Sequence, residues 1–324
     1  MAWPHEHTNW APYLAEARAA VAAIAAQISR FERLLMVARD TSPLELALRS
    51  AGAMWERVAC FTADSNDIWA RDFGPITVRE DDQPVLLDFR FNGWGRKHRA
   101  ERDDQITHRL TALGAFGRTA VRTQSLILEG GSIETDGQGT LLTTTSCLLN
   151  PNRNPTLDQR ALEAELHRHL GVQRVLWLSA GPLAGDDTDG HIDTLARFAP
   201  NDTLLYVRCP DPADEHHVPL AALEAQLRTL RTTGGRGYRL MPLPWPRARY
   251  EGSQRLPATY ANFLVLNRAV LVPAYGDPAD AAAREVVGRA FPGREIVSVD
   301  CACVIRQRGA VHCLTMQLPQ GVLA

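Results

Sequence analysis

Polar or reactive side chains of the kinds used in catalysis stand at five widely spaced points of this 324-residue chain. In order they are Asp72, Glu129, His191 with Asp193, Asn262 and Cys313. A cysteine can supply a nucleophile, and a histidine can transfer protons. Because a free thiol is only about 3% ionised at neutral pH, a site that uses Cys313 must also activate it.

The two aspartates restrict what such a site could bind. Carboxylates near a thiolate repel it and raise its pKa unless the substrate is itself a cation. A guanidinium offers five N–H donors in a planar fork, which paired carboxylates match bidentately. The residue types therefore predict attack of a thiolate on a guanidinium carbon, with His191 moving protons while water replaces ammonia.

The segments around these residues differ in how strongly each one, taken alone, indicates a functional site. The stretch Gly185–Asp193 is the densest acidic cluster, and His191 and Asp193 lie two apart, so a strand would place them on one face. Gly309–Gln317 is predicted as a strand that carries Cys313 and Thr315 on one face. His312 would then lie on the other face and is not expected to be the base.

Two other segments can be explained by a structural role alone. Ser65–Pro75 by itself suggests a loop in which Asp72 pairs with Arg71 at the surface. Glu129 directly follows the apolar run Leu126–Leu128, where an acid is costly unless it has a partner.

Helix-like and strand-like segments alternate along the whole chain. After the first helix, the starts recur at a period of roughly sixty residues, which is typical of a repeat architecture of about five units. The helices are expected at Ala11–Ser29, Pro43–Gly52, Asp103–Leu113, Leu157–His169, Pro219–Arg231 and Ala279–Ala290.

Each expected helix is followed by a strand and then by a hairpin-like pair of strands. The apolar runs are Leu34–Ala38, Ile76–Arg79, Val85–Phe91, Ser125–Leu128, Thr140–Thr145, Val175–Leu178, Thr203–Val207, Asn262–Leu266, Val270–Pro273 and Ile296–Val299. The polar residues stand at the ends of the units, after each helix and at the start of the first hairpin strand. Five units around an axis would bring them to one centre, within a single catalytic domain spanning residues 1–324.

Composition excludes several other classes. The chain is 45% apolar and 22% charged, with a net charge of −2 and no basic cluster, so no nucleic-acid partner is expected. No apolar run approaches a membrane span, and the start MAWPHEHTNW has no signal-peptide features, which predicts a cytoplasmic protein without a membrane partner. The six cysteines are scattered and fit neither a disulfide framework nor a zinc ribbon. No cofactor and no metal are expected.

Several longer motifs resemble one known family. NDIWARDFGPITV, DFRFNGWG, ILEGGSIETDGQGTLLTT, GDDTDGHIDTLARF, LPATYANFLVLN and VHCLTMQLP are similar to those of the agmatine deiminase and Porphyromonas-type peptidylarginine deiminase family, within the guanidine-modifying pentein superfamily. The resemblance covers nearly the whole chain. It implies an α/β fold, a five-bladed pseudo-symmetric propeller with a central site.

The resemblance also implies roles for individual residues. Cys313 would be the nucleophile and His191 the general acid/base, with Glu129 supporting the proton transfers. The guanidinium would be held by Asp72 and Asp193, and Trp69 would line the channel for the alkyl chain. The implied reaction converts agmatine to N-carbamoylputrescine and ammonia, a hydrolysis in polyamine biosynthesis, and a homodimer is expected from resemblance alone.

The chain departs from the family pattern at a few points. Arg306-Gln-Arg-Gly309 replaces the glycine run that often precedes the cysteine, Thr145-Ser146 stands where acids are frequent, and Arg96 replaces a common glycine. Family members also usually carry a further β-like segment before the WPH element, near which this chain begins.

The sequence leaves other functions open. Peptidyl-arginine or another guanidine could replace agmatine as the substrate. A catalytically silent propeller that binds a cationic ligand would need the acids but not the thiol. A metal hydrolase could use Asp186, Asp187, Asp189, His191 and Asp193, but this would leave Cys313 unexplained.

Overall fold

The computed structural model describes residues 1–323. They form two compact units. The first consists of Met1–Gly130 with His312–Ala324, and the second consists of Gly131–Val311. Among the described residues, no helix combines the length and the apolar character that crossing a bilayer requires.

The first unit contains two small sheets. In one, β1 and β2 are parallel, and in the other β4 pairs antiparallel with β3 and parallel with β5. The strands are β1 (Leu34–Ala38), β2 (Val58–Thr62), β3 (Ile76–Glu80), β4 (Gln83–Arg90) and β5 (Ala120–Ile127). The helices, with η for 3₁₀, are η1 (Ala11–Tyr13), α1 (Leu14–Ser29), α2 (Thr41–Ser50), η2 (Trp55–Arg57), α3 (Ala70–Phe73), α4 (Gly93–Arg96), η3 (Asp103–Gln105) and α5 (Ile106–Ala112).

The second unit contains three sheets of three strands and a short hairpin, β12–β13. The strands are β6 (Ile133–Thr135), β7 (Thr140–Thr144), β8 (Arg174–Leu178), β9 (Ala196–Ala199), β10 (Thr203–Val207), β11 (Arg239–Leu243), β12 (Arg249–Glu251), β13 (Gln254–Leu256), β14 (Leu264–Val265), β15 (Ala269–Ala274) and β16 (Glu295–Asp300). The helices are α6 (Thr145–Leu148), α7 (Gln159–Leu170), η5 (Ile192–Thr194), α8 (His217–Thr229), α9 (Asp280–Ala290) and η6 (Val304–Gln307), and η4 (Gly130–Ser132) begins at the junction.

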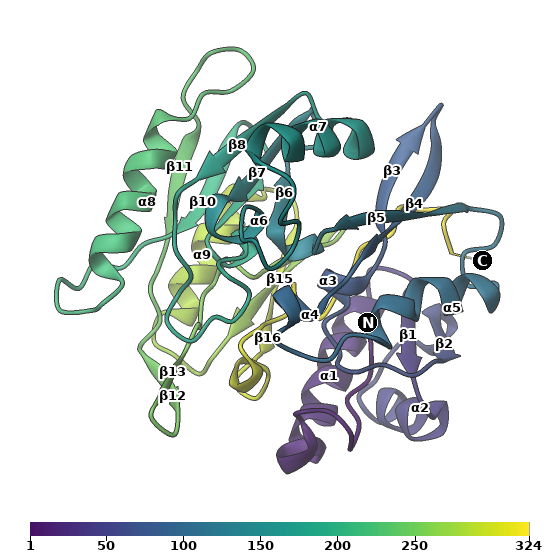
Figure 1. The fold of residues 1–324 in the computed structure, drawn as a ribbon. Helices are drawn as coiled ribbons and strands as arrows, with labels where there is room; N and C mark the ends of the chain where they lie inside the picture. The colour runs from purple at the N-terminus through teal and green to yellow at the C-terminus, as the bar shows by residue number, and fades with distance from the viewer. Residues whose placement is uncertain (324) are drawn as a thin grey trace. The chain divides into compact units, whose positions relative to one another are not determined.

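The sheets share one plan. A hairpin supplies an outer and a middle strand, a helix follows, and the next strand pairs in parallel with the middle one, as in β6-β7-α7-β8. Parallel pairing requires such a crossover. The order can be followed by colour in Figure 1, and β1-α2-β2 has only the last two strands of this plan. The sixty-residue period predicted from sequence is thus confirmed as a structural repeat.

The middle strands form the cores of the sheets. β7 and β10 are buried along their whole length, and β15 is buried except at its last residue. Strands covered on both faces are expected to carry continuous apolar runs rather than alternation. This explains why Thr203–Val207 and Leu34–Ala38 were delimited correctly from the sequence, whereas the less buried outer strands β2 and β6 were missed.

One predicted strand is wrong. Residues 311–314 form a turn. The backbone N–H and the hydroxyl of Thr315 both donate to the His312 carbonyl, each at 3.0 Å, so the chain folds back on itself. The alternation of faces that was used to separate His312 from Cys313 therefore does not apply.

Candidate active site

Asp72 lies in the one-turn helix α3, and its side chain is buried. Its Oδ2 accepts a hydrogen bond from the Trp94 indole N–H at 2.9 Å. The predicted alternative, a surface pair between Asp72 and Arg71, is wrong because both side chains are buried and Arg71 is directed elsewhere. The indole is a neutral donor, so this contact orients the carboxylate without cancelling its charge.

Trp94 was not recognised as a site residue from the sequence. It adopts a left-handed backbone, with φ 55° and ψ 47°, which is costly for a bulky side chain and is concentrated at functional sites. The flanking Gly93 makes the turn feasible, since a Cβ there would lie 2.2 Å from the His98 carbonyl oxygen. The motif Asn92-Gly-Trp-Gly95 was the available signal, because two glycines around an aromatic residue are typical of such a turn.

Arg71 connects the Asp72 segment to the Cys313 segment within the first unit. Its backbone N–H donates to the Cys313 carbonyl at 3.1 Å, and its Nε donates to the His312 carbonyl at 3.4 Å. The guanidinium also donates to the Gln317 side chain. Backbone and side chain together therefore hold the turn that contains Cys313, whose own side chain is 7% exposed.

Glu129 is fully buried two residues beyond the end of β5. The next residue must be glycine, because a Cβ on Gly130 would lie 2.2 Å from the Arg71 carbonyl oxygen. The backbone after Glu129 thus packs directly on the residue that holds Cys313. We call Asp72, Glu129 and Cys313 the Cys313 group. The predicted channel residue Trp69 is buried at the N-terminus of α3, the helix that contains Asp72.

His191 and Asp193 are buried in the second unit. The prediction that they share one face of a strand is wrong, because His191 caps the 3₁₀ helix η5, which contains Asp193. The turn is closed by Thr194, whose hydroxyl donates to the His191 carbonyl at 2.8 Å. Asn262 Nδ2 donates to Asp193 Oδ2 at 3.1 Å, again a neutral donor on an acid. We call His191, Asp193 and Asn262 the His191 group.

The carboxylates of the acidic loop before His191 are engaged in hydrogen bonds and ion pairs. Asp186 accepts the Thr188 hydroxyl at 2.7 Å and the Gly190 N–H at 2.8 Å, and burial raises its pKa. Arg153 donates to Asp189 at 2.7 Å, and Arg308 donates to Asp187 at 3.3 Å. Carboxylates already used in these ways are poor candidates for metal ligands, which weakens three of the five donors of the metal-hydrolase alternative.

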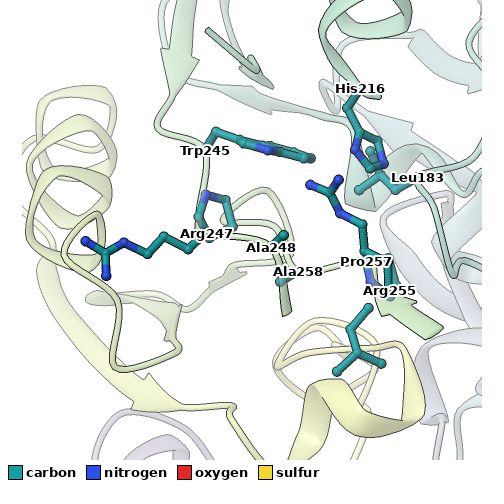
Figure 2. A pocket seen from close by; sticks show the side chains of 10 residues that line it. Leu183, His216, Trp245, Arg247, Ala248, Arg255, Pro257 and Ala258 are labelled. Carbon is teal, nitrogen blue, oxygen red and sulfur yellow. The ribbon is translucent and has the colours of Figure 1, made fainter. Parts of the chain in front are cut away.

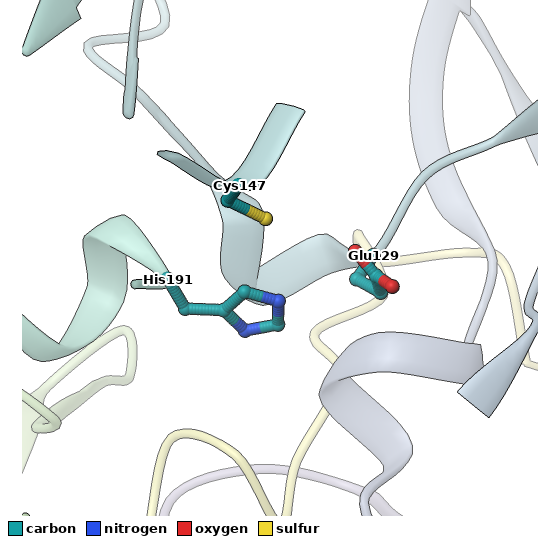
Figure 3. Close-up of side chains that lie close together, drawn as sticks. All are labelled: Glu129, Cys147 and His191. Atoms are coloured by element: carbon teal, nitrogen blue, oxygen red, sulfur yellow. The ribbon is translucent and has the colours of Figure 1, made fainter. Parts of the chain in front are cut away.

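Cys147 is a neighbour of His191 that the sequence gave no reason to select. Figure 3 shows its sulfur beside the imidazole, and a ring nitrogen lies within 4.8 Å of Sγ. It lies in α6, whose capping Thr144 hydroxyl donates to the Gly190 carbonyl at 2.7 Å. A second thiol next to the predicted base is a rival nucleophile that must be tested.

Three other cysteines, Cys60, Cys209 and Cys301, are less suited to nucleophilic attack. All six cysteines of the chain are free. Burial raises the pKa of Cys60 to about 11 and also raises the pKa of Cys301 and of Cys209. A thiol with a raised pKa is even less ionised at neutral pH than a free one.

The chain is similar to several known deiminases. The family model for Porphyromonas-type peptidyl-arginine deiminase matches residues 1–319. An agmatine deiminase of Stutzerimonas stutzeri is 35% identical, over 98% of this chain and 92% of the relative. A structure from Porphyromonas gingivalis, provisionally assigned as an arginine deiminase, is 49% identical with a TM-score of 0.94, covering 100% of this chain and 95% of that one.

A further structure is a cysteine-to-serine variant of agmatine deiminase from C. jejuni with substrate bound. It is 36% identical with a TM-score of 0.90, covering 96% of this chain and 90% of that one. The chain belongs to the Porphyromonas-type peptidyl-arginine deiminase family, whose deiminases hydrolyse C–N bonds. The predicted pentein α/β fold class is likewise confirmed by these structures.

Proposed function

We propose that this protein hydrolyses the guanidinium of agmatine to N-carbamoylputrescine and ammonia. The observation that carries the proposal is the 35% identity to an agmatine deiminase along 98% of the chain. One aspartate of the Cys313 group and one of the His191 group support the proposal. Asp72 and Asp193 are both buried, and each is oriented by a neutral hydrogen-bond donor. Such carboxylates suit a cationic planar fork.

In the proposed reaction, the Cys313 thiolate forms a bond to the guanidinium carbon. His191 gives a proton to the departing nitrogen, and the C–N bond breaks to release ammonia. The same imidazole then takes a proton from water, whose oxygen adds to the carbon of the thioether intermediate. Breaking the C–S bond returns the thiolate, and the hydroxyl on the carbon loses its proton, which leaves a neutral ureido group. Ammonia takes up that proton, so the sum is guanidinium plus water giving a urea derivative plus ammonium.

The remaining predicted residues have supporting roles in this proposal. Asp72 and Asp193 accept the guanidinium N–H groups and fix the carbon for attack, while Glu129 assists the proton transfers. Trp69 would cover the alkyl chain of the substrate. An arginine peptide is the second candidate, favoured by the name of the matching family model.

A substrate screen tests the proposal directly. Ammonia release should be measured with agmatine, free arginine, an arginine peptide and other guanidines, on the untreated and the EDTA-treated protein. Agmatine should give the largest kcat/KM, and EDTA should change nothing. A higher kcat/KM for the peptide would favour the second candidate, and activity that returns only with a divalent cation would contradict the thiol mechanism.

The identity of the nucleophile is tested with paired cysteine variants. Cys313→Ser should lower kcat by about 10³-fold or more, because an alcohol is a much weaker nucleophile at neutral pH. Cys147→Ser should retain most activity, and a haloacetamidine should label Cys313. Loss of turnover in Cys147→Ser, together with labelling at that residue, would transfer the role to the cysteine beside His191.

The carboxylate clamp is tested with Asp72→Asn and Asp193→Asn. Each should lower kcat as well as raise KM, because the same contacts bind and position the substrate. Asp158→Asn is the control, since Asp158 only caps α7 by accepting from the Ala161 N–H. If Asp72→Asn lowers the melting temperature but leaves kcat/KM unchanged, Asp72 is structural.

The broader setting of the enzyme also belongs to this proposal. A small metabolite as substrate suits a cytoplasmic enzyme of polyamine synthesis. The single catalytic domain and the homodimer expected from the sequence remain predictions. Light scattering during size-exclusion chromatography would test the dimer.

A further inference from the structure

A partly buried polar cluster in the second unit lies next to the loop that leads to His191. Figure 2 shows three of its members, His216, Trp245 and Arg255, with the Arg255 guanidinium close to both rings. They line a small cavity of about 10 Å³. The rings of His216 and Trp245 are 5.1 Å apart. The cluster is centred on Asp214, which none of the roles assigned above uses.

Asp214 collects donors from the whole cluster. Its carboxylate accepts from Arg255 at 2.6 and 3.0 Å, from the Trp245 indole N–H at 3.1 Å, and from the His216 backbone N–H at 2.9 Å. Its Oδ1 also lies 2.8 Å from His216 Nδ1. These contacts fix the imidazole from one side.

The other ring nitrogen of His216 binds the loop. The Ala184 backbone N–H donates to His216 Nε2 at 2.8 Å. Because Nε2 accepts, the ring proton must be on Nδ1, where Asp214 accepts it. The aspartate therefore selects the tautomer that can hold Ala184.

From Ala184 a continuous chain of contacts reaches His191. The Asp186 N–H donates to the Leu183 carbonyl at 2.9 Å, and the Asp186 side chain accepts the Thr188 hydroxyl at 2.7 Å. The same Thr188 oxygen accepts the His191 N–H at 3.0 Å. Each step lies between neighbours in the loop, so displacement at one end would be passed to the other.

The loop has little room to adjust on its own. A Cβ at Gly185 would lie 1.9 Å from the Arg255 carbonyl oxygen, so backbone meets backbone there. Gly190 is also tightly enclosed, since a Cβ would lie 3.0 Å from Ser146 Oγ and 3.3 Å from the Pro182 nitrogen. Arg255 thus contacts the loop through its carbonyl and the cluster through its side chain.

We propose that His216 is a positioning residue for His191, acting through its Nε2 contact with Ala184 and the bonded loop Ala184–Gly190. His216 is not itself a proton carrier in the reaction, since both ring nitrogens are engaged in the cluster. This inference rests on the role of His191 in the proposed function. It adds Asp214, Arg255 and Trp245 as the groups that keep His216 in place.

The test compares three single variants of neighbouring histidines. His216→Asn is too short to reach Ala184, whereas His216→Gln can place an amide oxygen near the position of Nε2. His217→Asn is the matched control, because His217 is the first residue of α8, which His216 caps, but its ring bonds the Cys209 carbonyl at 3.0 Å. Kinetics with agmatine and hydrogen exchange of the amides in residues 184–191 are measured for each.

His216→Asn should lower kcat about 10- to 100-fold with KM changed less than about threefold, since small misplacement of a catalytic group is costly. The amides of residues 184–191 should exchange faster. His216→Gln should restore slow exchange and most of kcat, and His217→Asn should behave as the wild type. A folded His216→Asn variant with wild-type kcat, or an equal loss in His217→Asn, would overturn the proposal.

Two further results separate this inference from the proposed function. If the wild type releases no ammonia from any guanidine, the proposed function fails, while loop exchange still decides the role of His216. Should His216→Asn fail to fold, Trp245→Phe removes only the indole N–H on Asp214 and keeps a ring beside His216. Faster exchange at residues 184–191 in that variant supports the proposal, and unchanged exchange rejects it.

Discussion

The loops that carry Asp72 and His191 are each held by aspartates that lie partly or fully inside the protein. The two sets of aspartates differ in the groups that donate hydrogen bonds to them. In the first unit, Asp103 accepts the backbone N–H groups of Asn66 at 2.6 Å and Asp67 at 3.3 Å. Asp67 in turn accepts the Trp10 indole N–H at 2.9 Å. We call Asp67 and Asp103 the neutral-donor cluster. In the second unit, Asp214 is paired with Arg255 and forms the arginine cluster with His216 and Trp245.

The donors decide the charge of each cluster. Burial raises the pKa of Asp103 to about 8 and that of Asp67 to about 6, because N–H groups compensate only part of the lost hydration. Burial also raises the pKa of Asp214, but the hydrogen bonds from Arg255 and its neighbours outweigh this and hold the pKa below its usual range. Asp214 is partly exposed and has a cation among its partners, whereas Asp103 is buried among neutral donors. Both differences favour the charged form of Asp214.

The largest effect is expected where the charge pair is broken. The Asp214 and Arg255 side chains are 12% and 11% exposed. Asp214→Asn should lower the free energy of unfolding by about 3 kcal/mol, because Arg255 loses the less exposed of its two carboxylate partners. Urea denaturation at pH 7 measures this loss.

The control for that variant is Glu215→Gln. Glu215 is the more exposed second partner of Arg255, with an N–O distance of 3.0 Å, and its loss should cost less than about 1 kcal/mol. Similar losses of unfolding free energy in the two variants would show that Asp214 contributes no more to stability than the exposed Glu215.

A pH-dependent effect is expected in the neutral-donor cluster. The folded-state pKa of Asp103 lies above the unfolded value, so the folded protein binds a proton that the unfolded chain has released between about pH 4 and 8. Stability from this group is present at low pH and is lost as the pH rises towards 8. Asp103→Asn imitates the protonated form and does not titrate.

The measurement is the free energy of unfolding of both proteins from pH 5 to pH 7.5. The wild type should lose stability relative to Asp103→Asn by up to about 1.4 kcal/mol per pH unit. Asp67 and Asp88, whose pKa burial raises to about 6, are present in both proteins. A difference that does not change with pH would mean that Asp103 is ionised throughout.

The smallest effect is expected from Asp67→Asn at pH 5. Asp67 is mostly protonated at this pH. In the wild type its Oδ1 accepts from the Trp10 indole N–H and, at 2.8 Å, from the Ile68 N–H, and the amide oxygen of the variant can still accept both hydrogen bonds. The loss of stability should stay below about 1 kcal/mol. Asp214→Asn at the same pH should remain far more damaging. Equal losses from the two variants would remove the distinction between the clusters.

The sequence was a good guide wherever neighbours along the chain decide the structure. The helix predicted at Ala279–Ala290 forms at Asp280–Ala290, and the run Thr203–Val207 is β10. Such elements depend on local propensity and on continuous burial. The prediction failed around Cys313 because the turn is closed by Thr315 and held by Arg71, which no local alternation can indicate.

By itself, the sequence indicated the repeat and the family and predicted which residues are reactive, because these depend on spacing and on short motifs. Only the tertiary structure decided which groups orient them and which carboxylates carry charge. Asn66 and Asp103 are 37 residues apart, and Asp214 and Arg255 are 41 apart. Partners at such separations are chosen by folding, and a carboxylate takes its pKa from the donors that folding brings to it.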